Sequence, residues 1–414
     1  MKTTQLSRGV VETFTSPRKL PSCTTSEQRN SYSLLPRSAP HPTRRIRTEA
    51  ASTTENQSFT SPLDNLLAPS TVPTRRISTQ EALDALYSSQ HATQRMKFAA
   101  FYSSELGGIV TDPALMVVQL DDHMVHRGHA VFDTALMTEG FIYQLGPHVE
   151  RFLASAARAN IPLPPRTSPE QLVRIILETA AASQELNGSI RYFLSAGRGG
   201  FGLSSSECIH SSLYVIVSRS DESARNSEEH LTGWKVKTSP VPSKHPYFAT
   251  LKSTNYLPNA LAVIDAQTEG FDQGIFLDSN GNVAEGPNMN LGVILHDGTL
   301  VVPPFETTLP GITVRRVLNL AAGAMARGIL DGVNKIERRH LGLQEAKGAA
   351  EVFLVGTSLP VMSVVKWDDT VIGDGQPGIA SLQLRALVQG DMMPREDSDQ
   401  HVEIPYGYLT GMGA

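Results

Sequence analysis

The segment LKSTNYLPNALA occupies residues 251–262 and places a single lysine, Lys252, at the start of a mostly apolar run. An amine in apolar surroundings loses hydration, which lowers its pKa and makes it a nucleophile toward aldehydes. A lone lysine is nevertheless more often a solvated surface residue than a buried one. Lys252 therefore indicates a catalytic role only in combination with the other sequence blocks described below.

A second block, NVAEGPNMNLGVI at residues 282–294, places Glu285 at the end of a turn before an apolar strand. A carboxylate there could face a cleft and keep the ring nitrogen of pyridoxal phosphate protonated, so that the ring withdraws electrons. The alternative is a turn carboxylate in solvent.

Two turns and one arginine could hold a phosphate group. The turn PGIT at 310–313 opens a predicted helix at 312–328, whose free N–H groups attract anions. The small turn Gly356-Thr357-Ser358 follows a predicted strand at 351–355. Arg151, on a predicted helix at 148–160, could bind a phosphate with two parallel hydrogen bonds. Each feature alone is commonplace.

In this order, six blocks resemble the fold-type IV pyridoxal-phosphate enzymes, also called the class IV aminotransferases. The blocks are HRGHAVFDTA (126–135), HVERFLASA (148–156), LKSTNYLPNALA (251–262), NVAEGPNMNLGVI (282–294), PGIT (310–313) and VGTS (355–358). The resemblance spans roughly residues 98 to 390. It is greatest to the branch of D-amino-acid transaminases and aminodeoxychorismate lyases of plant chloroplasts.

The resemblance implies a two-lobed α/β (α+β) fold of type IV, with a smaller N-terminal α/β lobe and a larger C-terminal pseudo-barrel lobe. We expect the lobes at 96–225 and 226–402, followed by a tail at 403–414. Independently of the resemblance, hairpin turn signals at Asn280-Gly281 and Asp297-Gly298 argue against a doubly wound parallel sheet.

Hydrophobic periodicity and turn signals predict the secondary structure of both lobes. The segment from Phe98 to Thr138 is expected to be extended. Helices are predicted at 78–87, 148–160, 168–186, 255–269, 312–328 and 377–388, and strands at 189–196, 211–219, 234–238, 274–278, 289–295, 299–302, 351–355 and 361–366.

The resemblance also implies pyridoxal 5′-phosphate as cofactor and assigns roles to the matching residues. Lys252 would form the Schiff base and move the proton, Glu285 would pair with the pyridinium nitrogen, and Tyr256 would hydrogen-bond the O3′ oxygen. The phosphate would be held by Arg151, Ile312, Thr313 and Thr357.

The implied activity is transamination between a D-amino acid and a 2-oxo acid, carried out by a homodimer. Two alternatives stay open: an aminodeoxychorismate lyase, which forms 4-aminobenzoate and pyruvate for folate synthesis, and a branched-chain L-amino-acid aminotransferase. The Arg-x-His pair of the bacterial D-amino-acid enzyme is missing after predicted strand 189–196. The candidate readers of the substrate carboxylate are therefore Arg127, which we favour, and Arg198.

Composition excludes several other classes of protein. The formal net charge of −5 argues against a dedicated nucleic-acid binder, and no apolar run approaches the 18 residues of a membrane span. Two cysteines, Cys23 and Cys208, cannot make a disulfide framework or a thiolate metal site.

Two further motifs are rejected on geometry. His123, His126 and His129 recur every third residue, but an extended segment would point His123 and His126 to opposite faces, so no metal site is expected. The run GRGGFG at 197–202 matches the dinucleotide fingerprint, yet serines and a strand follow it where the fingerprint needs a helix. We interpret it as a connection between strands.

The first 50 residues carry nine Lys or Arg and three acids, and they are rich in Ser and Thr. This composition, without an apolar core, is typical of an organellar transit peptide, with the chloroplast favoured over the mitochondrion. We expect a transit peptide at 1–60 and a linker with a short helix at 61–95.

We predict that residues 1–60 contribute nothing to folding or activity, because their composition supports no packed core. A chain that begins at Ser78 should keep the full activity and the unfolding temperature of the whole chain. Comparison of the two by calorimetry and by assay would test this. A collapse of stability on removing the first 60 residues alone would refute it.

Overall fold

The computed structural model describes residues 74–89, 97–220, 229–395 and 398–407. The chain divides into a unit at Met1–Arg75 and a unit at Arg76–Ala414, and all the helices and strands given below belong to the second. The expected transit peptide at 1–60 lies outside the described residues, as does the point near residue 225 where the two predicted lobes meet.

A seven-stranded antiparallel sheet forms the first lobe, in the order β15-β4-β3-β5-β6-β1-β2. Strand β3, which lies between β4 and β5, is buried along nearly its whole length, so its sequence AVFDTALMT is mostly apolar and shows no alternation. The strands are β1 (Phe98–Ser103), β2 (Gly108–Val110), β3 (Ala130–Thr138), β4 (Phe141–Tyr143), β5 (Gly188–Ser195), β6 (Ser212–Arg219) and β15 (His401–Glu403).

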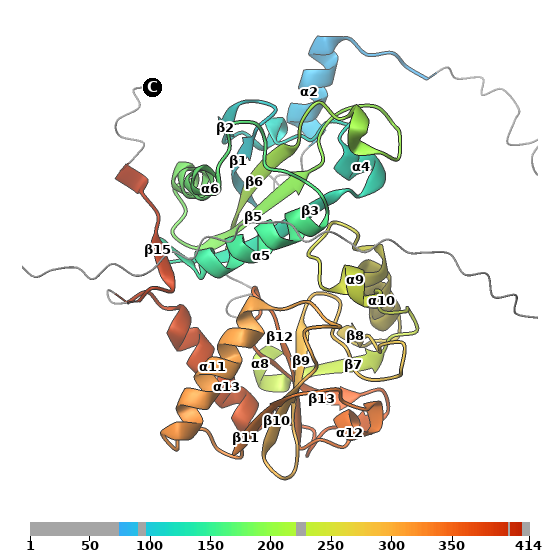
Figure 1. The fold of residues 1–414 in the computed structure, drawn as a ribbon, viewed down its shortest axis with the longest axis vertical. Helices are drawn as coiled ribbons and strands as arrows, with labels where there is room; N and C mark the ends of the chain where they lie inside the picture. Colours follow the sequence, from blue (N-terminus) through green and yellow to red (C-terminus); the bar gives the residue numbers. More distant parts are fainter. Residues whose placement is uncertain (1–73, 90–96, 221–228, 396–397, 408–414) are drawn as a thin grey trace, which may run out of the picture. The chain divides into compact units, whose positions relative to one another are not determined.

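Helix α5 (Leu145–Arg158) lies along β3, on the side of the first sheet that faces the second lobe (Figure 1). Helix α6 (Pro169–Ser183) packs on β1 and β6, and its predicted start is confirmed: Ser168 and Gln171 form a reciprocal capping box. A further helix, α2 (Thr79–Ser89), precedes the sheet.

The prediction of a continuously extended segment from Phe98 to Thr138 is wrong in its middle. Residues His123–Arg127 form a short helix, α4, capped at its start by the Asp122 carboxylate, which accepts a hydrogen bond from the Met124 N–H. Gly128 ends the helix at φ 63°, a conformation that favours glycine. Five residues are too few to show a helical period in the sequence.

Because this segment is helical, the prediction that His123 and His126 point to opposite faces is also wrong. Their ring centroids are 5.1 Å apart, and His123 Nδ1 lies 3.1 Å from His129 Nδ1. Within the described ranges, no group of three or more His, Cys, Asp or Glu residues is arranged to hold a metal ion. The run at 197–202 connects β5 to β6 through the 3₁₀ turn Ser205–Glu207, as predicted.

A second, mixed sheet of eight strands follows the order β11-β10-β9-β12-β13-β7-β8, with β14 paired to β13. Helices α11 and α13 lie side by side against it (Figure 1). The strands are β7 (Trp234–Thr238), β8 (Gln273–Ile275), β9 (Asn290–Ile294), β10 (Thr299–Val302), β11 (Lys335–Arg338), β12 (Glu351–Val355), β13 (Met362–Trp367) and β14 (Thr370–Val371). The helices are α8 (Glu229–Thr232), α9 (Pro246–Ala249), α10 (Leu257–Thr268), α11 (Ile312–Ala326), α12 (Leu343–Lys347) and α13 (Ile379–Met392).

The two lobes are joined by polar contacts and by the end of the chain. The Asp391 carboxylate on α13 accepts hydrogen bonds from Tyr143 on β4 and from Arg316 on α11. The chain then returns to the first sheet, where β15 pairs with β4. The expected lobe boundary at residue 402 therefore falls inside a strand of the first sheet.

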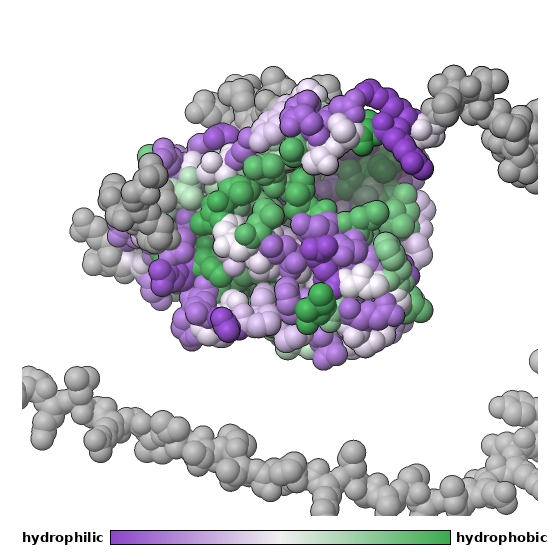
Figure 2. Space-filling view, turned by 90° about the horizontal axis from the view of Figure 1, so that it is seen from above, coloured by the Kyte–Doolittle hydropathy of each residue, from purple (hydrophilic) through white to green (hydrophobic). Residues whose placement is uncertain are grey.

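Apolar residues cover a broad area of the surface seen from above in Figure 2. Exposed apolar side chains of the first lobe include Leu106, Leu120, Phe201, Leu203 and Ile209. In the part of the chain that the structure describes, no helix has both the length and the apolar character to cross a membrane.

Candidate active site

Backbone pairing with β3 fixes the position of Lys252. The Lys252 carbonyl accepts a hydrogen bond from Phe132 N–H at 2.9 Å, and Thr254 N–H donates to the Ala130 carbonyl at 3.0 Å. Ser253 forms an isolated antiparallel bridge with Val131 between these two contacts. The short segment 252–254 thus runs as an extra strand beside the first sheet, and Lys252 Nζ lies 4.7 Å from the centre of the Phe132 ring.

Burial and the positive charge of Arg151 lower the pKa of Lys252 to about 8. The carboxylates of Asp133 and Glu285 act in the opposite direction, while Arg191 adds to the lowering. An amine with this pKa is uncharged in a substantial fraction of molecules at slightly alkaline pH, which is the form that attacks carbonyl groups and accepts protons.

Arg151 is held by a buried carboxylate on β3. Arg151 Nε and Nη2 donate to Asp133 Oδ2 and Oδ1 at 2.8 and 2.7 Å, and His148 Nδ1 lies 2.9 Å from Asp133 Oδ1. Burial alone would raise the pKa of Asp133, but Arg151 and His148 hold it well below its usual range. Sequence analysis missed Asp133 and His148, although an acid inside the apolar run AVFDTALMT is itself a signal.

Glu285 is largely buried beside the turn that precedes α11. Its Oε2 accepts a hydrogen bond from Leu309 N–H at 3.0 Å, and Asn290 Nδ2 approaches the same oxygen at 3.4 Å. Burial raises the pKa of Glu285 to about 7, against the effects of the Leu309 N–H and of the ammonium groups of Lys244 and Lys252.

Tyr256 lies between Lys244 and Phe132. Lys244 Nζ is 4.3 Å from the centre of the Tyr256 ring, and the Tyr256 and Phe132 rings meet edge to face at 5.2 Å. Burial and the charge of Glu285 raise the pKa of the Tyr256 hydroxyl well above its usual range, so this group is a hydrogen-bond donor at neutral pH.

The start of α11 supplies backbone donors near Arg151. The helix begins at Ile312, and no side chain caps its first N–H groups. Arg151 Nη1 reaches the Pro310 carbonyl at 3.4 Å, which brings the guanidinium to this turn. A Cβ at Gly311 would lie 1.9 Å from Asn290 Oδ1, so a larger residue here would displace the Asn290 side chain.

Thr357 lies in the turn that follows β12. The last residue of β12, Val355, pairs with Asn290 of β9, so this turn begins beside the segment that carries Glu285. The residues predicted to bind a cofactor thus come from α5, the segment 252–256, the turn before β9, the start of α11 and the end of β12.

The two predicted readers of a substrate carboxylate make other contacts. Arg127 is exposed at the end of α4 and donates to the carbonyl groups of His126 and Phe201. Arg198 forms two 3.0 Å hydrogen bonds with Asp121, which anchor it although it lies among glycines. None of these contacts involves Lys252 or the Phe132 ring beside it.

A different arginine, Arg191 on β5, shares the Phe132 ring with Lys252. Its guanidinium lies 5.4 Å from the ring centre and donates to Thr134 Oγ1 at 2.9 Å. It is the only exposed residue of its strand, and its charge lowers the pKa of Lys252. Sequence analysis missed Arg191. The signal that could have identified it is a charged residue in the middle of the predicted strand 189–196.

Known proteins resemble this chain in sequence. The family described as "Amino-transferase class IV" matches residues 130–367. The chloroplastic D-amino-acid transaminase of Arabidopsis thaliana is 43% identical over 311 residues, which are 75% of this chain and 80% of that protein. A putative branched-chain-amino-acid aminotransferase of Methanocaldococcus jannaschii is 28% identical over 281 residues, covering 68% of this chain and 93% of that protein.

Solved structures share the fold at lower identity. The branched-chain amino acid aminotransferase of Escherichia coli superposes with a TM-score of 0.66 at 22% identity, covering 74% of this chain and all of that one. The branched-chain amino acid aminotransferase of Thermobaculum terrenum, solved in its PLP form, gives 0.61 at 19% identity, covering 72% of this chain and 94% of that one.

The raised pKa of Glu285 predicts a specific pH dependence of stability in the chain without bound molecules. The folded pKa of about 7 exceeds the ordinary value of 4.5, so the stabilisation from this group is complete below pH 4.5 and is lost as pH rises through 7. The group should lower the free energy of unfolding by about 3 kcal/mol between pH 4.5 and pH 8. Glu285→Gln should remove this loss in urea unfolding.

The matched control is Glu150→Gln, which changes an exposed carboxylate on α5. It should keep the pH dependence of the parent chain. Equal pH dependence in the two variants would show that Glu285 ionises in the folded chain as it does in solvent.

Proposed function

The chain belongs to the class IV aminotransferase family, and we propose that it uses pyridoxal 5′-phosphate to transfer amino groups between D-amino acids and 2-oxo acids. The observation that carries the proposal is the largely buried Lys252, with its lowered pKa, in the field of Arg151, Asp133 and Glu285. Preference for D-amino acids is supported by 43% identity to the D-amino-acid transaminase of Arabidopsis thaliana.

The residues present fit the proposed cofactor in their chemistry. Glu285 has a largely buried carboxylate that interacts with the ammonium groups of Lys244 and Lys252. The same carboxylate would pair with a protonated ring nitrogen. Arg151 and the uncapped first turn of α11 fit a phosphate dianion. When bound, the cofactor supplies an electron sink for the bond broken at the substrate Cα.

The chain's own residues then supply the proton transfer and the positioning. Lys252, neutral above about pH 8, would take the proton from the substrate Cα and return it. Asp133 positions Arg151 through two hydrogen bonds, and Tyr256 would donate to the cofactor's O3′ oxygen. The backbone N–H groups of Ile312 and Thr313 would donate hydrogen bonds to the phosphate. Thr357 would be the fourth residue, with Arg151, that contacts it.

Branched-chain L-amino-acid transamination is the second candidate, and the relative in Methanocaldococcus jannaschii favours it. The lyase reaction on aminodeoxychorismate stays a prediction from the sequence. Both would use Lys252 and the same cofactor, so only the substrate distinguishes them from the main proposal.

We also propose a homodimer in the chloroplast. Exposed apolar side chains on the first lobe, such as Leu203 at 85% and Ile209 at 86% exposure, support burial against a second copy. The relative in Arabidopsis thaliana is chloroplastic, and the basic, Ser-rich and Thr-rich start of the chain supports the same destination.

The proposed activity is tested by assaying the holoenzyme with D-alanine, L-leucine and aminodeoxychorismate in parallel. We expect turnover of D-alanine to be greatest, and we expect Lys252→Ala to abolish both turnover and the visible absorbance of the bound cofactor. Lys335→Ala, at an exposed lysine on β11, is the control that should change neither. Greater turnover of L-leucine would establish the second candidate, and retained absorbance in Lys252→Ala would overturn the role of Lys252.

For the substrate carboxylate, we propose Arg191 ahead of Arg127 and Arg198, since only Arg191 shares the Phe132 ring with Lys252. Arg191→Met should slow the reaction of D-alanine by at least about tenfold, because a hydrogen bond to a charged group contributes about 1.5–3 kcal/mol. The half-reaction of an amine without a carboxylate should slow by much less, because it loses only the effect of Arg191 on the pKa of Lys252.

The controls are Arg127→Met and Arg198→Met, measured with the same two donors. If Arg127→Met alone slows D-alanine selectively, the carboxylate lies near α4 and Arg127 is its partner. If Arg191→Met slows both donors equally, Arg191 supports Phe132 and does not contact the substrate carboxylate.

A further inference from the structure

Lys244 is a partly buried lysine in the segment between β7 and α9, eight residues before Lys252. In the part of the chain that the structure describes, its ammonium group forms no hydrogen bond or ion pair. The Nζ atom instead lies over the face of the Tyr256 ring, 4.3 Å from the ring centre. Burying part of an ammonium group without a paired carboxylate costs free energy, so this position calls for an explanation.

Lys244 and Glu285 line the same small cavity, of about 30 Å³. A space of this size holds about one water molecule, so its walls lie close together. Tyr256 and Asn259 line it as well, and Asn259 is only 8% exposed. The Oδ1 atom of Asn259 has no hydrogen-bond partner among the described residues. The cavity therefore brings one cation together with a carboxylate, an unused acceptor and an aromatic ring.

Two ammonium groups favour the charged form of Glu285, and Lys244 has the larger effect of the two. In return, the charge of Glu285 raises the pKa of Lys244, which burial lowers. The second ammonium group, Lys252, would bond to the cofactor and move the proton in the proposed reaction. Lys244 takes no part in that chemistry, so its charge beside Glu285 stays the same from step to step.

The other groups around Glu285 cannot replace this charge. The Leu309 N–H and the Asn290 amide that approach its Oε2 are neutral. The pKa of Tyr256 lies well above its usual range, so its hydroxyl is neutral too.

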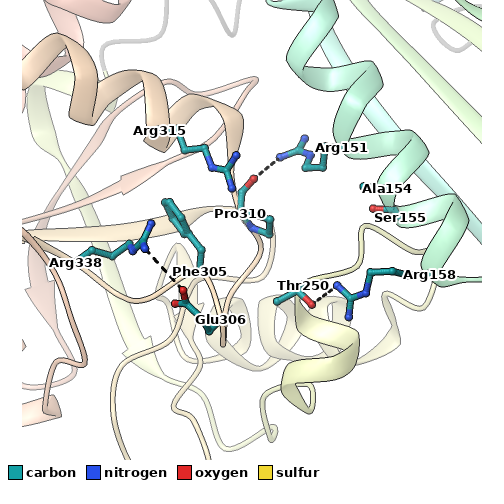
Figure 3. Close-up of a pocket in the computed structure, with 10 residues that line it drawn as sticks. All are labelled: Arg151, Ala154, Ser155, Arg158, Thr250, Phe305, Glu306, Pro310, Arg315 and Arg338. Atoms are coloured by element: carbon teal, nitrogen blue, oxygen red, sulfur yellow. Dashed lines mark hydrogen bonds and ion pairs between the residues drawn. The ribbon is translucent and has the colours of Figure 1, made fainter. Parts of the chain in front are cut away.

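The arginines that the structure places near the start of α11 lie around a different cavity. Figure 3 shows Arg151 and Arg315 directed toward Pro310. None of the residues that line that cavity lines the one shared by Lys244 and Glu285. The charge of Lys244 is therefore separate from the groups that would bind the cofactor's phosphate.

We propose that Lys244 is a positioning residue, which acts through Glu285 by keeping its carboxylate charged for the ring nitrogen of the cofactor. The inference rests on the proposed function, in which Glu285 pairs with that nitrogen. A protonated Glu285 would not favour a protonated ring, and the electron withdrawal that the reaction needs would be weakened. The Tyr256 ring holds the ammonium group in place, because cations are attracted to the face of an aromatic ring.

The first measurement follows the free energy of urea unfolding of the full-length chain, without cofactor, from about pH 5 to pH 9. The folded pKa of Glu285, about 7, exceeds the ordinary value of 4.5, so stability falls with rising pH until the folded carboxyl is ionised. Lys244→Met should raise the pKa of Glu285 further, so that the fall continues to higher pH. Lys244→Arg, which keeps the charge, should restore the parent profile. Lys235→Met, at an exposed lysine on β7, should leave it unchanged.

Because Lys244 also titrates, Lys244→Met is repeated in the Glu285→Gln background. The difference between the two backgrounds isolates the effect that passes through Glu285. We expect the extended fall in the parent background alone. The same change of profile in both backgrounds would overturn the proposal.

The second measurement is the affinity of the same variants for pyridoxal phosphate, expressed as a ratio to the parent chain at each pH. Lys244→Met should bind about fivefold more weakly at pH 7, and the ratio should approach one near pH 9, where Glu285 is ionised in both. Tighter binding would show that Lys244 competes with the ring nitrogen for Glu285. An equal loss at every pH would show that Lys244 only supports the fold around Tyr256. Either result would overturn the proposal.

The two measurements also separate this inference from the proposed function. A chain that takes up no cofactor, but whose stability profile responds to Lys244 through Glu285, would refute the proposed function and leave the effect of Lys244 on Glu285 standing. An active transaminase in which Lys244→Met changes neither profile would refute the role of Lys244 and leave the proposed function intact.

Discussion

The arrangement of the site depends on two backbone hydrogen bonds between the start of β3 and residues 252–254, which together form one antiparallel bridge. They attach a segment from the second half of the sequence to β3 of the first sheet. Because β3 is buried and paired on both sides, its backbone is fixed within the sheet. Lys252 is therefore held beside Phe132, one residue away from the Asp133 that anchors Arg151.

Placing so many charges in one largely buried region has an electrostatic consequence. Asp133 is ionised because it faces Arg151 and His148 directly, and those hydrogen bonds outweigh its burial. In the described structure, Lys252 and Glu285 form no ion pair, so burial dominates and shifts the pKa of each toward the value that favours its neutral form. The structure thus separates a fixed ion pair, which positions a side chain, from two groups whose protonation can change near neutral pH. Only groups of the second kind can exchange protons with a substrate.

Local signals predicted the elements whose ends are determined locally. The capping box at Ser168 and the strands at 234–238, 299–302 and 351–355 are examples. Elements that depend on distant partners were not predicted. Strand β15 exists because β4 offers it an edge, and no residue within 401–403 carries that information. Helix α4 does have local signals, the cap at Asp122 and the stop at Gly128, but its five residues are too few to show a helical period.

The same distinction explains which part of the site escaped the sequence. Motif blocks preserve order along the chain, so Lys252, Glu285 and Arg151 could be selected before their positions were known. Arg191 belongs to no block, and it reaches the Phe132 ring only because β5 pairs with β3 in a register that sets Arg191 opposite Thr134. A shift of one residue in that register would turn Arg191 to the other face of the sheet. The position of this positive charge beside Lys252 therefore depends on strand pairing. Motifs alone select Arg127 and Arg198, which lie outside the strands, instead.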